Sequence, residues 1–496
     1  MQAGGPGWWA RRGYGSMPGF ELKLGVTMSA DKGLKKDAIS FLSNVTFGIS
    51  STSPAYSIAA SLGPIAAVAG YGSMGIMLVA FIPMLFVAVA FYHLNRADPD
   101  CGTTFSWARR AIGPKSGWIA GWSIIVANIL VMPSLADIAG RYSFQLIGIG
   151  DPSAVAVGIV GVVWIIVITA ICYVGIALSA RTQHLLLGAE LLILAVFAIL
   201  ALIQVYGPNP PGGSHRIAWT WFDPLRAGGF DAFAQAMVLA VFLYWGWDSC
   251  LSVNEETKDP HAAPGYAAVV STLVLVAIYG LVVAAAVAVG GPHLLSVNKD
   301  DALAPIGEAV LGIRFSKILV FAVLTSAVAS TQTSILPAAR MALSMAHAGA
   351  IPVRFRHIHT RHLSPGFATV TMGAVSVVWY LGLTWLSQDV LTDSIAALGL
   401  VIAFYYGLTG LACVVFYRRG LFASVGGFLS KGVIPGAGAL MMFLLLLKVA
   451  FAPGDDSQTT IMGIPGPVAI AVLAMLTGAV LMLAARHRMP RFFRDR

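Results

Sequence analysis

The stretch Gly48-Ile49-Ser50-Ser51-Thr52-Ser53-Pro54 places a glycine, four hydroxyl residues and a proline inside an otherwise apolar run. Proline removes a backbone donor and hydroxyl side chains compete for backbone hydrogen bonds, so this stretch predicts an interrupted helix. A second apolar run ends in Tyr244-Trp245-Gly246-Trp247-Asp248-Ser249, where a glycine and an acid predict another interruption. Gly48 and Gly246 lie 198 positions apart. We therefore expect two related halves, each opening with a discontinuous helix.

The sequence around the two breaks has the composition of a membrane protein. Of its 496 residues, 57% are hydrophobic and 11% are charged, whereas ordinary soluble domains carry about 25% charged residues. No Asp, Glu, Lys or Arg occurs in the 58 positions between Asp37 and Arg96, which is room for two helices of roughly 20 residues each. A water-soluble globular protein is excluded, and the lipid bilayer is an expected partner.

Apolar runs bounded by charges, glycines and prolines predict an all-α polytopic membrane protein with 12 transmembrane helices. The expected helices span residues 38–63, 67–93, 116–147, 153–177, 183–206, 231–252, 264–289, 316–346, 366–387, 393–417, 433–452 and 465–485. The spacing of helices one to five recurs in helices six to ten, which predicts a five-plus-five inverted repeat with discontinuous helices one and six. The expected division is an N-terminal tail (1–36), a first repeat (37–206), a second repeat (231–418), helices eleven and twelve (432–485) and a basic tail (486–496).

The 31 lysines and arginines are concentrated in alternate loops. With the N-terminus inside, 24 of them fall in cytosolic segments and five in outside loops, and positive loops stay on the cytosolic side. We therefore expect a multi-pass protein of the plasma membrane with both termini cytosolic. The net charge of +9 belongs to these loops, so no nucleic-acid partner is expected. The four cysteines are far apart and form no CxxC pair, so neither a disulfide framework nor a metal site is expected.

The two breaks also predict the binding site, because interrupted transmembrane helices expose backbone groups near the bilayer midplane. Backbone amides in the first break are expected to receive a carboxylate, and carbonyls around both breaks are expected to receive an ammonium group. The amides are those near Ser51, Thr52 and Ser53, and the carbonyls are those around Phe47, Tyr244 and Trp245. The full set of expected substrate-binding residues is Phe47, Gly48, Ser50, Ser51, Thr52, Ser53, Tyr244, Trp245, Gly246, Trp247 and Asp248. The alternative is that both stretches are ordinary kinks in packed helices.

Three motifs carry a resemblance to a known family. Glu255-Glu256-Thr257-Lys258-Asp259-Pro260 follows the second break, and Pro99-Asp100-Cys101-Gly102-Thr103-Thr104-Phe105-Ser106-Trp107 precedes the third helix. The third motif runs from Arg340 through Ala346-His347-Ala348-Gly349-Ala350-Ile351-Pro352 to Ser364-Pro365. In this order the motifs resemble the amino acid/polyamine/organocation (APC) superfamily of permeases, over at least residues 40 to 420. The resemblance implies a LeuT-like five-plus-five fold and the transport of amino acids or related amines.

One departure from the family bears on the substrate class. The family's first helix usually carries glycines where this chain has Ser50-Ser51-Thr52 after Gly48. This hydroxyl-rich break looks more like the branch that contains 4-aminobutyrate and choline permeases. The expected substrate is therefore an amino acid, a 4-aminobutyrate-like compound or a polyamine.

Glu190 lies one third of the way into the predicted fifth helix, where an unpaired charge costs at least about 2.5–3.5 kcal/mol. Proton-coupled members that resemble this chain have a lysine there. A carboxylate in a low-dielectric site could bind and release a proton near neutral pH, so Glu190 is a candidate coupling residue. It could instead ligate sodium together with Ser330, Thr331 or Thr333, or lie near cytosolic water without a coupling role.

Other residues in the predicted spans have two interpretations each. Asp137 and Arg141 are four residues apart on the third helix, so they form a local ion pair, or else Asp137 binds a substrate amine. Asp248 follows the second break and either caps the next half-helix or binds an amine. Trp245 or Trp247 either covers a bound substrate or packs in the core.

The cytosolic end of the sixth helix carries an acidic pair. Glu255 and Glu256 are expected to pair with loop cations such as Arg109 or Arg110. By position and by resemblance to the family, these pairs would hold an inward gate closed.

Taken together, these residues favour a secondary active transporter that moves an amino acid or related amine by alternating access, coupled to a proton. A sodium-coupled or exchange-type permease is the alternative mechanism. A transport-silent nutrient sensor with the same fold is an alternative of another class. The loops contain no GxSxG or HExxH motif and are too short for a catalytic domain, so neither an enzyme nor a cofactor is expected.

Overall fold

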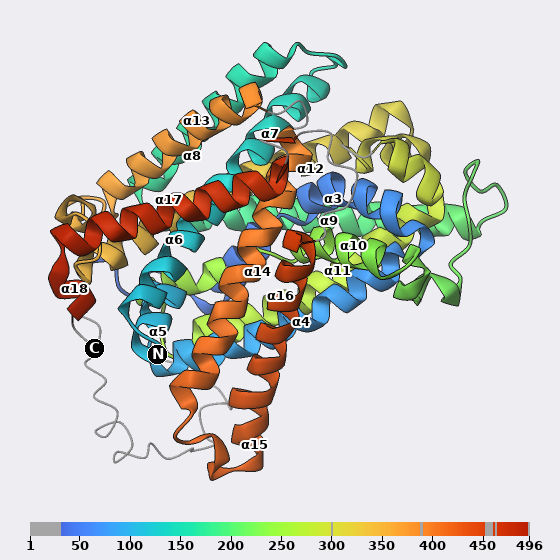
Figure 1. Ribbon diagram of the computed structural model, residues 1–496. Coiled ribbons are helices and arrows are strands. Elements are labelled where there is room, and N and C mark those ends of the chain that lie inside the picture. The colour runs from blue at the N-terminus through green and yellow to red at the C-terminus, as the bar shows by residue number, and fades with distance from the viewer. Residues whose placement is uncertain (1–30, 299–300, 387–389, 452–459, 462–463, 495–496) are drawn as a thin grey trace, which may run out of the picture. The chain divides into compact units, whose positions relative to one another are not determined.

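The first predicted transmembrane helix is discontinuous in the computed structural model, which describes residues 31–298, 301–386, 390–451, 460–461 and 464–494 (Figure 1). Helix α2 (Phe41–Thr52) ends at Ser53, whose φ of 48° lies in the left-handed region, and α3 (Pro54–Ala69) begins at the next residue. Proline suits the first position of a helix because the N–H that it lacks would have no partner there. The expected interruption of helix one is confirmed, although it lies at Ser53 and not at Gly48.

The predicted sixth helix is also interrupted. Helix α10 (Phe230–Leu243) ends before the irregular stretch 244–246, and the 3-10 helix η5 (Trp247–Glu256) follows it. Gly246 has a φ of 119°, a conformation that residues with a side chain rarely adopt, so glycine permits the chain to change direction here. Helices one and six are therefore both broken, as the sequence predicts. The division into two inverted repeats stays a prediction.

The remaining helices are mostly long and apolar. They are α4 (Ser73–Ala97), α5 (Thr103–Ala111), α6 (Pro114–Leu130), α7 (Met132–Leu146), α8 (Ala154–Val174), α9 (Ile176–Tyr206), α11 (Ala263–Val297), α12 (Leu303–His347), α13 (Gly366–Leu386), α14 (Val390–Tyr417), α16 (Ile434–Phe451) and α17 (Gly466–Arg488). Short helical segments lie between them: η2 (Gly70–Gly72), η3 (Trp219–Phe222), η4 (Pro224–Ala227), η6 (Val353–Arg356), η7 (Leu421–Ala423), α15 (Val425–Phe428) and η8 (Leu429–Val433). The short helix α18 (Pro490–Arg494) follows α17. The two-residue strands β1 (Thr460–Ile461) and β2 (Ile464–Pro465) pair antiparallel. The predicted all-α class is confirmed.

Eleven helical segments of the described residues are long and apolar enough to cross a membrane, so the chain is a multi-pass membrane protein. The first of these segments, Phe41–Ala97, has 57 residues and contains α2, α3 and α4. At 1.5 Å per residue it would extend about 85 Å as one straight helix, whereas the hydrocarbon core of a bilayer is about 30 Å thick. This segment has the length for two spans, and the count of 12 stays a prediction.

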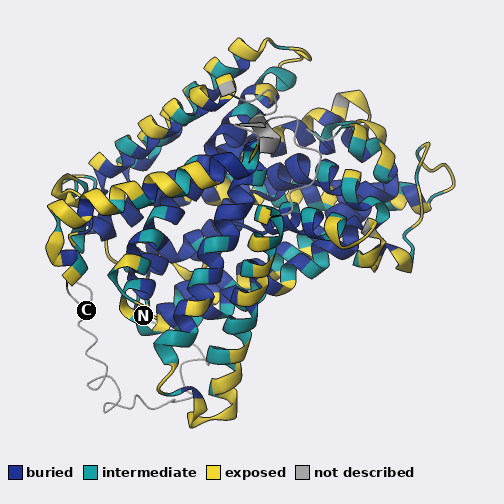
Figure 2. Cartoon of the chain, in the orientation of Figure 1, coloured by how far each residue is buried: buried dark blue, intermediate teal, exposed yellow. Residues whose placement is uncertain are grey.

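Burial separates central helices from peripheral ones within Lys32–Arg496, which forms one compact unit. The most apolar windows of Phe230–Glu256 and Phe315–His347 are 89% buried, against 28% for α8. Figure 2 shows this contrast, with buried residues gathered in the middle and exposed residues along α8 and α17. The exposed side chains of α8 are apolar, as lipid contact requires, for example Val155 and Ile159. The broken sixth helix and α12 therefore lie in the centre, where a site would be enclosed.

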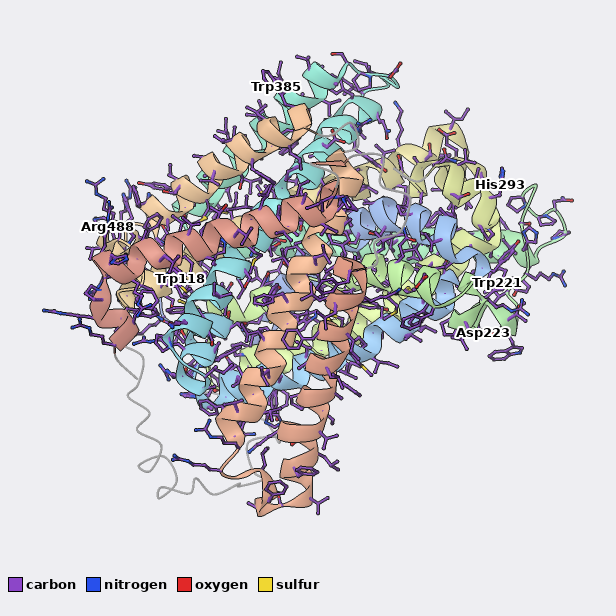
Figure 3. All side chains as sticks on the ribbon, viewed as in Figure 1. Trp118, Trp221, Asp223, His293, Trp385 and Arg488 are labelled. Carbon is purple, nitrogen blue, oxygen red and sulfur yellow. The ribbon has the colours of Figure 1, made fainter. Side chains whose placement is uncertain are left out.

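Labelled side chains mark the two ends of the helices (Figure 3). Arg488 and Trp118 lie at one end, whereas Trp221, Asp223 and His293 lie at the opposite end. The distribution of lysine and arginine predicts that the first end is cytosolic and the second is outside, and this orientation stays a prediction.

Candidate functional site

The two helix breaks touch each other. Ser51, in the last turn of α2, and Ser249, in η5, share a hydrogen bond of 2.7 Å between their hydroxyl oxygens. A Cβ atom on Gly246 would lie 2.6 Å from the Ser51 carbonyl oxygen, so only glycine fits this contact. The structure thus brings together the two stretches that the sequence analysis singled out.

The amide groups at the first break differ from those expected. Ser51 and Thr52 lie inside α2, and the Ser53 amide donates back to the last turn of the same helix at 3.2 Å. Pro54 has no N–H, so the amides at the start of α3 begin with that of Ala55. The expectation that the amides near residues 51–53 receive a substrate carboxylate is corrected, because α2 continues through this stretch.

Gly48 and Phe47 also lie within α2 and not at the break. A Cβ atom on Gly48 would lie 2.4 Å from the Ser271 hydroxyl oxygen of α11, so this glycine serves close packing between helices. Neither Phe47 nor Gly48 therefore lies at the break, where both were expected. Tyr244 and Trp245 do lie in the irregular stretch of helix six, as expected.

The Glu190 side chain of α9 contacts the N-terminus of α3. Its Oε1 accepts hydrogen bonds from the Ala55 amide at 2.8 Å and from the Ser326 hydroxyl of α12 at 2.7 Å. A helix N-terminus stabilises a carboxylate through its exposed amides and its dipole. The side chain is fully buried, and its Oε2 has no hydrogen-bond partner among the described residues. Glu190 thus links α9, α3 and α12 at the break and keeps one buried carboxylate oxygen without a hydrogen-bond partner among the described residues.

The hydroxyl residues of α12 differ in what they contact. Ser330 Oγ donates to a carbonyl at the end of α2 at 3.2 Å, so it lies at the break. The hydroxyls of Thr331 and Thr333 donate to carbonyls of their own helix, at 3.0 and 3.3 Å. Ser326, which the sequence analysis missed, contacts Glu190 directly. The signal for it is spacing, because residues four apart share a helix face and Ser326 precedes Ser330 by four positions.

Asp248 lies beside the second break and accepts hydrogen bonds from two tyrosines of α14. Tyr406 OH donates to Oδ1 at 2.9 Å, and Tyr405 OH donates to Oδ2 at 3.1 Å. Trp245 donates its indole N–H to the Tyr405 hydroxyl in turn. Two phenols therefore orient this carboxylate. Neither of the two roles expected for Asp248, capping the next half-helix or binding an amine, includes these tyrosines.

A small cavity of about 10 Å³ lies next to this cluster. Its lining includes Trp245 and Asp248 beside the break, Tyr405 of α14 and Cys101 from the loop before α5. A cavity of this size has room for about one water molecule, so the site is closed around no more than a small group. Trp245 thus borders the cavity, whereas Trp247 is fully buried and packs against neighbouring aromatic rings in the core.

Asp137 and Arg141 of α7 form the local ion pair that the sequence analysis considered. Arg141 Nε lies 2.6 Å from Asp137 Oδ2. The Arg141 side chain is 58% exposed and that of Asp137 is 13% exposed. The guanidinium therefore competes with any substrate amine for Asp137.

The partners of Glu255 and Glu256 differ from the expected arginines. Glu255 Oε1 lies 2.5 Å from Lys32 Nζ, and Glu256 Oε2 lies 2.6 Å from Arg340 Nη2. Arg340 begins the third of the family motifs, whereas Lys32 lies in the tail that precedes helix one. Both acidic groups are paired, but with a residue before helix one and a residue of α12.

Arg109 and Arg110, the expected gate cations, contact other groups. Arg110 Nη1 lies 2.6 Å from Asp98 Oδ1, and the Arg109 guanidinium lies 5.1 Å from the centroid of the Phe492 ring. Burial raises the pKa of Asp98 to about 7, although Arg110 beside it opposes this rise. The expected pairing is corrected because the last turn of α5 faces Asp98 and α18.

Replacing Arg340 with alanine is expected to lower the free energy of unfolding by about 3–5 kcal/mol. Both side chains of its pair are 1% exposed, so the variant would leave the Glu256 carboxylate buried without a countercharge. Thermal unfolding of the detergent-solubilised protein measures the change. The control combines Arg340→Met with Glu256→Leu, which should recover much of the loss because no charge stays buried. Wild-type stability of Arg340→Ala would contradict this account.

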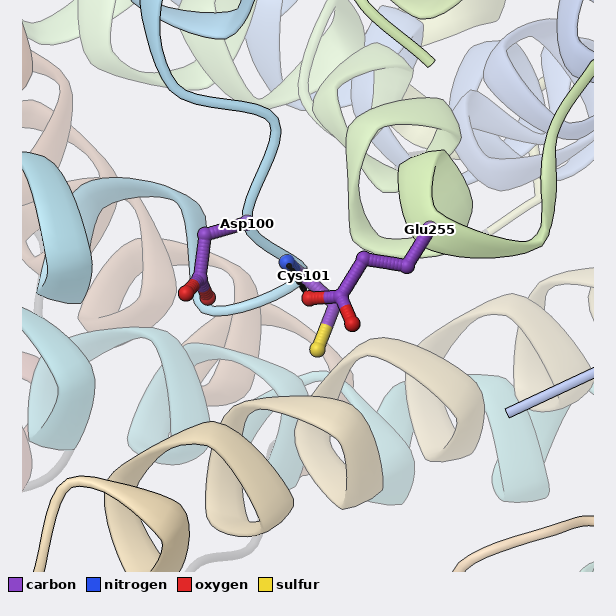
Figure 4. Close-up of side chains that lie close together, drawn as sticks. All are labelled: Asp100, Cys101 and Glu255. Atoms are coloured by element: carbon purple, nitrogen blue, oxygen red, sulfur yellow. Dashed lines mark hydrogen bonds between the residues drawn. The ribbon is translucent and has the colours of Figure 1, made fainter. Parts of the chain in front are cut away.

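Asp100, Cys101 and Glu255 lie close together, where the loop before α5 meets the last turn of η5 (Figure 4). Their ligand atoms lie within 4.8 Å of one another, which is the size of a metal site. Lys32 Nζ, however, lies 2.5 Å from Glu255, 3.0 Å from Asp100 and 3.6 Å from the Cys101 sulfur. The lysine ammonium thus takes the position that a metal ion would need.

Comparison with known proteins agrees with this architecture. The family described as amino acid permease matches residues 39–480. An uncharacterized transporter of Mycobacterium tuberculosis is 28% identical over 326 residues, which are 64% of this chain and 68% of the relative. The branched-chain amino acid permease BcaP of Lactococcus lactis is 23% identical over 359 residues, or 69% and 74% of the two chains. The low-affinity putrescine importer PlaP of Escherichia coli is 24% identical over 315 residues, or 60% and 65%.

These relatives are transporters and not enzymes, and the family match covers most of the chain. The broken helices, the apolar spans and the three motifs fit the same class. The chain is a membrane transporter of amino acids or related amines. It belongs to the amino acid permease family of the APC superfamily.

Proposed function

We propose that this chain is a secondary active transporter that carries an amino acid or related amine across the plasma membrane by alternating access, with both termini in the cytosol. The observation that carries the proposal is the contact between two broken helices, through the 2.7 Å hydrogen bond of Ser51 and Ser249. Broken helices offer backbone dipoles to a small solute in the middle of the membrane. Helices one, two, six and seven then rock against the others, and bound solute shifts the population of the two states.

We further propose that the coupling ion is a proton and that Glu190 carries it. The Glu190 carboxylate holds the first turn of α3 through the Ala55 amide, and it also accepts from Ser326. Protonation would remove the negative charge from the N-terminus of α3 and weaken the attachment of α3 to α9. Sodium held by Glu190 and Ser330 is the alternative at the same place.

The substrate amine is assigned to Asp248. Two of the relatives are named for branched-chain amino acids and for putrescine, and both kinds of compound carry an amine. Asp248 lines the cavity at the break, and Tyr405 and Tyr406 orient its carboxylate. A carboxylate held in place by two donors suits a charge-assisted bond to an ammonium group.

Uptake into proteoliposomes tests the proposal. A labelled panel of neutral amino acids, cationic amino acids, 4-aminobutyrate and polyamines is offered under an imposed proton gradient or an imposed sodium gradient. We expect accumulation of at least one amine under the proton gradient. Accumulation under the sodium gradient alone would favour the sodium alternative. Binding of an amine without any uptake would favour the nutrient sensor.

Replacing Asp248 with asparagine is expected to weaken substrate binding by at least about tenfold, which corresponds to about 1.4 kcal/mol. The amide keeps the size of the side chain and can still accept from one tyrosine, but it offers no charge to the substrate ammonium. Equilibrium binding in nanodiscs measures the dissociation constant. Tyr406→Phe is the control that keeps the carboxylate, so its loss should be smaller. Unchanged affinity of Asp248→Asn would place the amine elsewhere.

A further inference from the structure

We propose that the segment Lys32-Gly33-Leu34 is a plug that closes the cytosolic exit of the transport pathway and must leave its seat before substrate reaches the cytosol. The inference rests on the proposed function and goes beyond it, since it assigns a gating role to residues that precede the first helix. Two contacts of different chemistry hold the segment, one polar and one apolar. These contacts bear on transport because the segment lies next to the cavity at the break.

The polar contact is made by Lys32, which is only 5% exposed, an unusual state for a lysine. Its ammonium lies 2.5 Å from Glu255 of the broken sixth helix and 3.0 Å from Asp100 of the loop before α5. Asp100 also accepts a hydrogen bond from Ser344 of α12 at 2.8 Å. Burial alone would lower the pKa of Lys32, but the adjacent Cys101, Asp100 and Glu255 raise it well above its usual range. One charged side chain thus joins helix six to a loop and to α12.

The apolar contact is made by Leu34, two residues further along the chain. Leu34 is 6% exposed and packs with Cys101 and Leu343, and Ile358 lies against this cluster. Leu343 belongs to α12, and Ile358 follows η6. Gly33 has a φ of 77°, which bends the chain between its polar and apolar neighbours. The segment is therefore seated at two points and does not merely pass over the surface.

The plug lies directly beyond the cavity at the break. Cys101 lines that cavity, and it also contacts Lys32 at 3.6 Å and packs against Leu34. Cys101 is itself fully buried. A solute that leaves the cavity past Cys101 would therefore meet Lys32 and Leu34, so this exit opens only when they move.

The backbone after the plug shows which contacts would break on opening. The Ile39 amide donates to the Glu256 carbonyl at 2.9 Å, and the Lys258 amide donates to the Ile39 carbonyl at 2.9 Å. This bridge fastens the chain to the end of helix six. If helix six moves away from the loop before α5, Lys32 can keep Glu255 while its contact with Asp100 is lost.

Labelling of Cys101 tests the plug without any need for transport. A membrane-impermeant maleimide is applied to each face of membrane vesicles in turn, and the modification of each cysteine is followed by peptide mass. Lys32→Ala is expected to raise the rate of Cys101 modification from the cytosolic face at least tenfold, whereas Lys32→Arg should stay near wild type. Lys35→Ala is the matched control, because it removes an exposed lysine from the same segment. Leu34→Ser should also speed labelling by removing the apolar contact.

Equal rates of Cys101 modification in Lys32→Ala and wild type would overturn the plug. A parallel rise at the buried Cys172, Cys250 and Cys413 would overturn it too, because Lys32 would then stabilise the whole fold. Faster labelling of Cys101 alone, in a protein that carries no amine, would support the plug and reject transport. The experiments can therefore reject the transport proposal while supporting the plug, or reject the plug while leaving transport in place.

Discussion

Substituting leucine for Gly246 is expected to abolish substrate binding, with the dissociation constant rising by about a hundredfold or more. Two features of the position give this result. Its φ of 119° disfavours any side chain, and a Cβ atom would lie 2.6 Å from the Ser51 carbonyl oxygen. That oxygen is backbone, so it cannot rotate away as the tip of a side chain can. Leucine would therefore push the two helix breaks apart and fill the space beside Asp248.

Equilibrium binding of the substrate found in the uptake panel measures the effect of Gly246→Leu. Gly382→Leu is the matched control, because nothing lies within 4 Å of a Cβ atom at that position in α13. The control should bind as wild type does. Size-exclusion chromatography separates loss of the site from loss of the fold. Wild-type affinity in a folded Gly246→Leu protein would move the binding site away from the breaks.

Local chemistry explains why both interruptions were predictable from the sequence. Proline has no backbone N–H and suits the first position of a helix, and glycine tolerates positive φ, so Pro54 and Gly246 each favour an interruption at their own position. The hydroxyl residues before Pro54 are less informative, because they can bond to carbonyls one turn earlier. Thr52 Oγ1 donates to the Ile49 carbonyl at 2.6 Å. A side-chain bond of this kind can form inside a continuous helix, and α2 runs on to Thr52, so the break lies at Ser53 beside Pro54 and not at Gly48.

The partners of buried charges were not predictable, because they come from distant parts of the chain. Glu190 meets Ser326 across 136 positions, and Lys32 meets Glu255 across 223 positions. A single sequence carries residue types and local spacing but no such distances. Arg340 was visible within a motif, yet only the structure shows that it faces Glu256.

The tyrosines beside Asp248 gave a weak signal that the sequence analysis did not use. Tyr405 and Tyr406 are adjacent phenols in the apolar helix α14, and a buried hydroxyl group usually finds a hydrogen-bond partner. Adjacent residues on a helix point in directions about 100° apart, so spacing alone does not suggest that both meet one carboxylate. Both do so here, and Asp248 lies in the first turn of η5, just after the irregular stretch 244–246.

Glu190→Gln is expected to reduce proton-driven accumulation of substrate by about a hundredfold or more, while the dissociation constant stays within about threefold of wild type. Glutamine has the same size, and its carbonyl oxygen can still accept from the Ala55 amide and the Ser326 hydroxyl. Its amide cannot take up and release a proton at physiological pH, so an inward proton flow would have no carrier at the start of α3. Uptake under an imposed proton gradient, measured beside equilibrium binding, separates the two effects.

Glu190→Asp is the matched control for this experiment, because it keeps a titratable carboxyl group with one methylene fewer. It should retain part of the proton-driven accumulation, since a shorter side chain weakens the contact with α3 but can still exchange a proton. Exchange of labelled for unlabelled substrate should persist in Glu190→Gln, because exchange needs the helix breaks and no net proton flow. Proton-driven accumulation at the wild-type level in Glu190→Gln would remove this residue from coupling and leave its carboxylate with the structural task of holding α3 against α9 and α12.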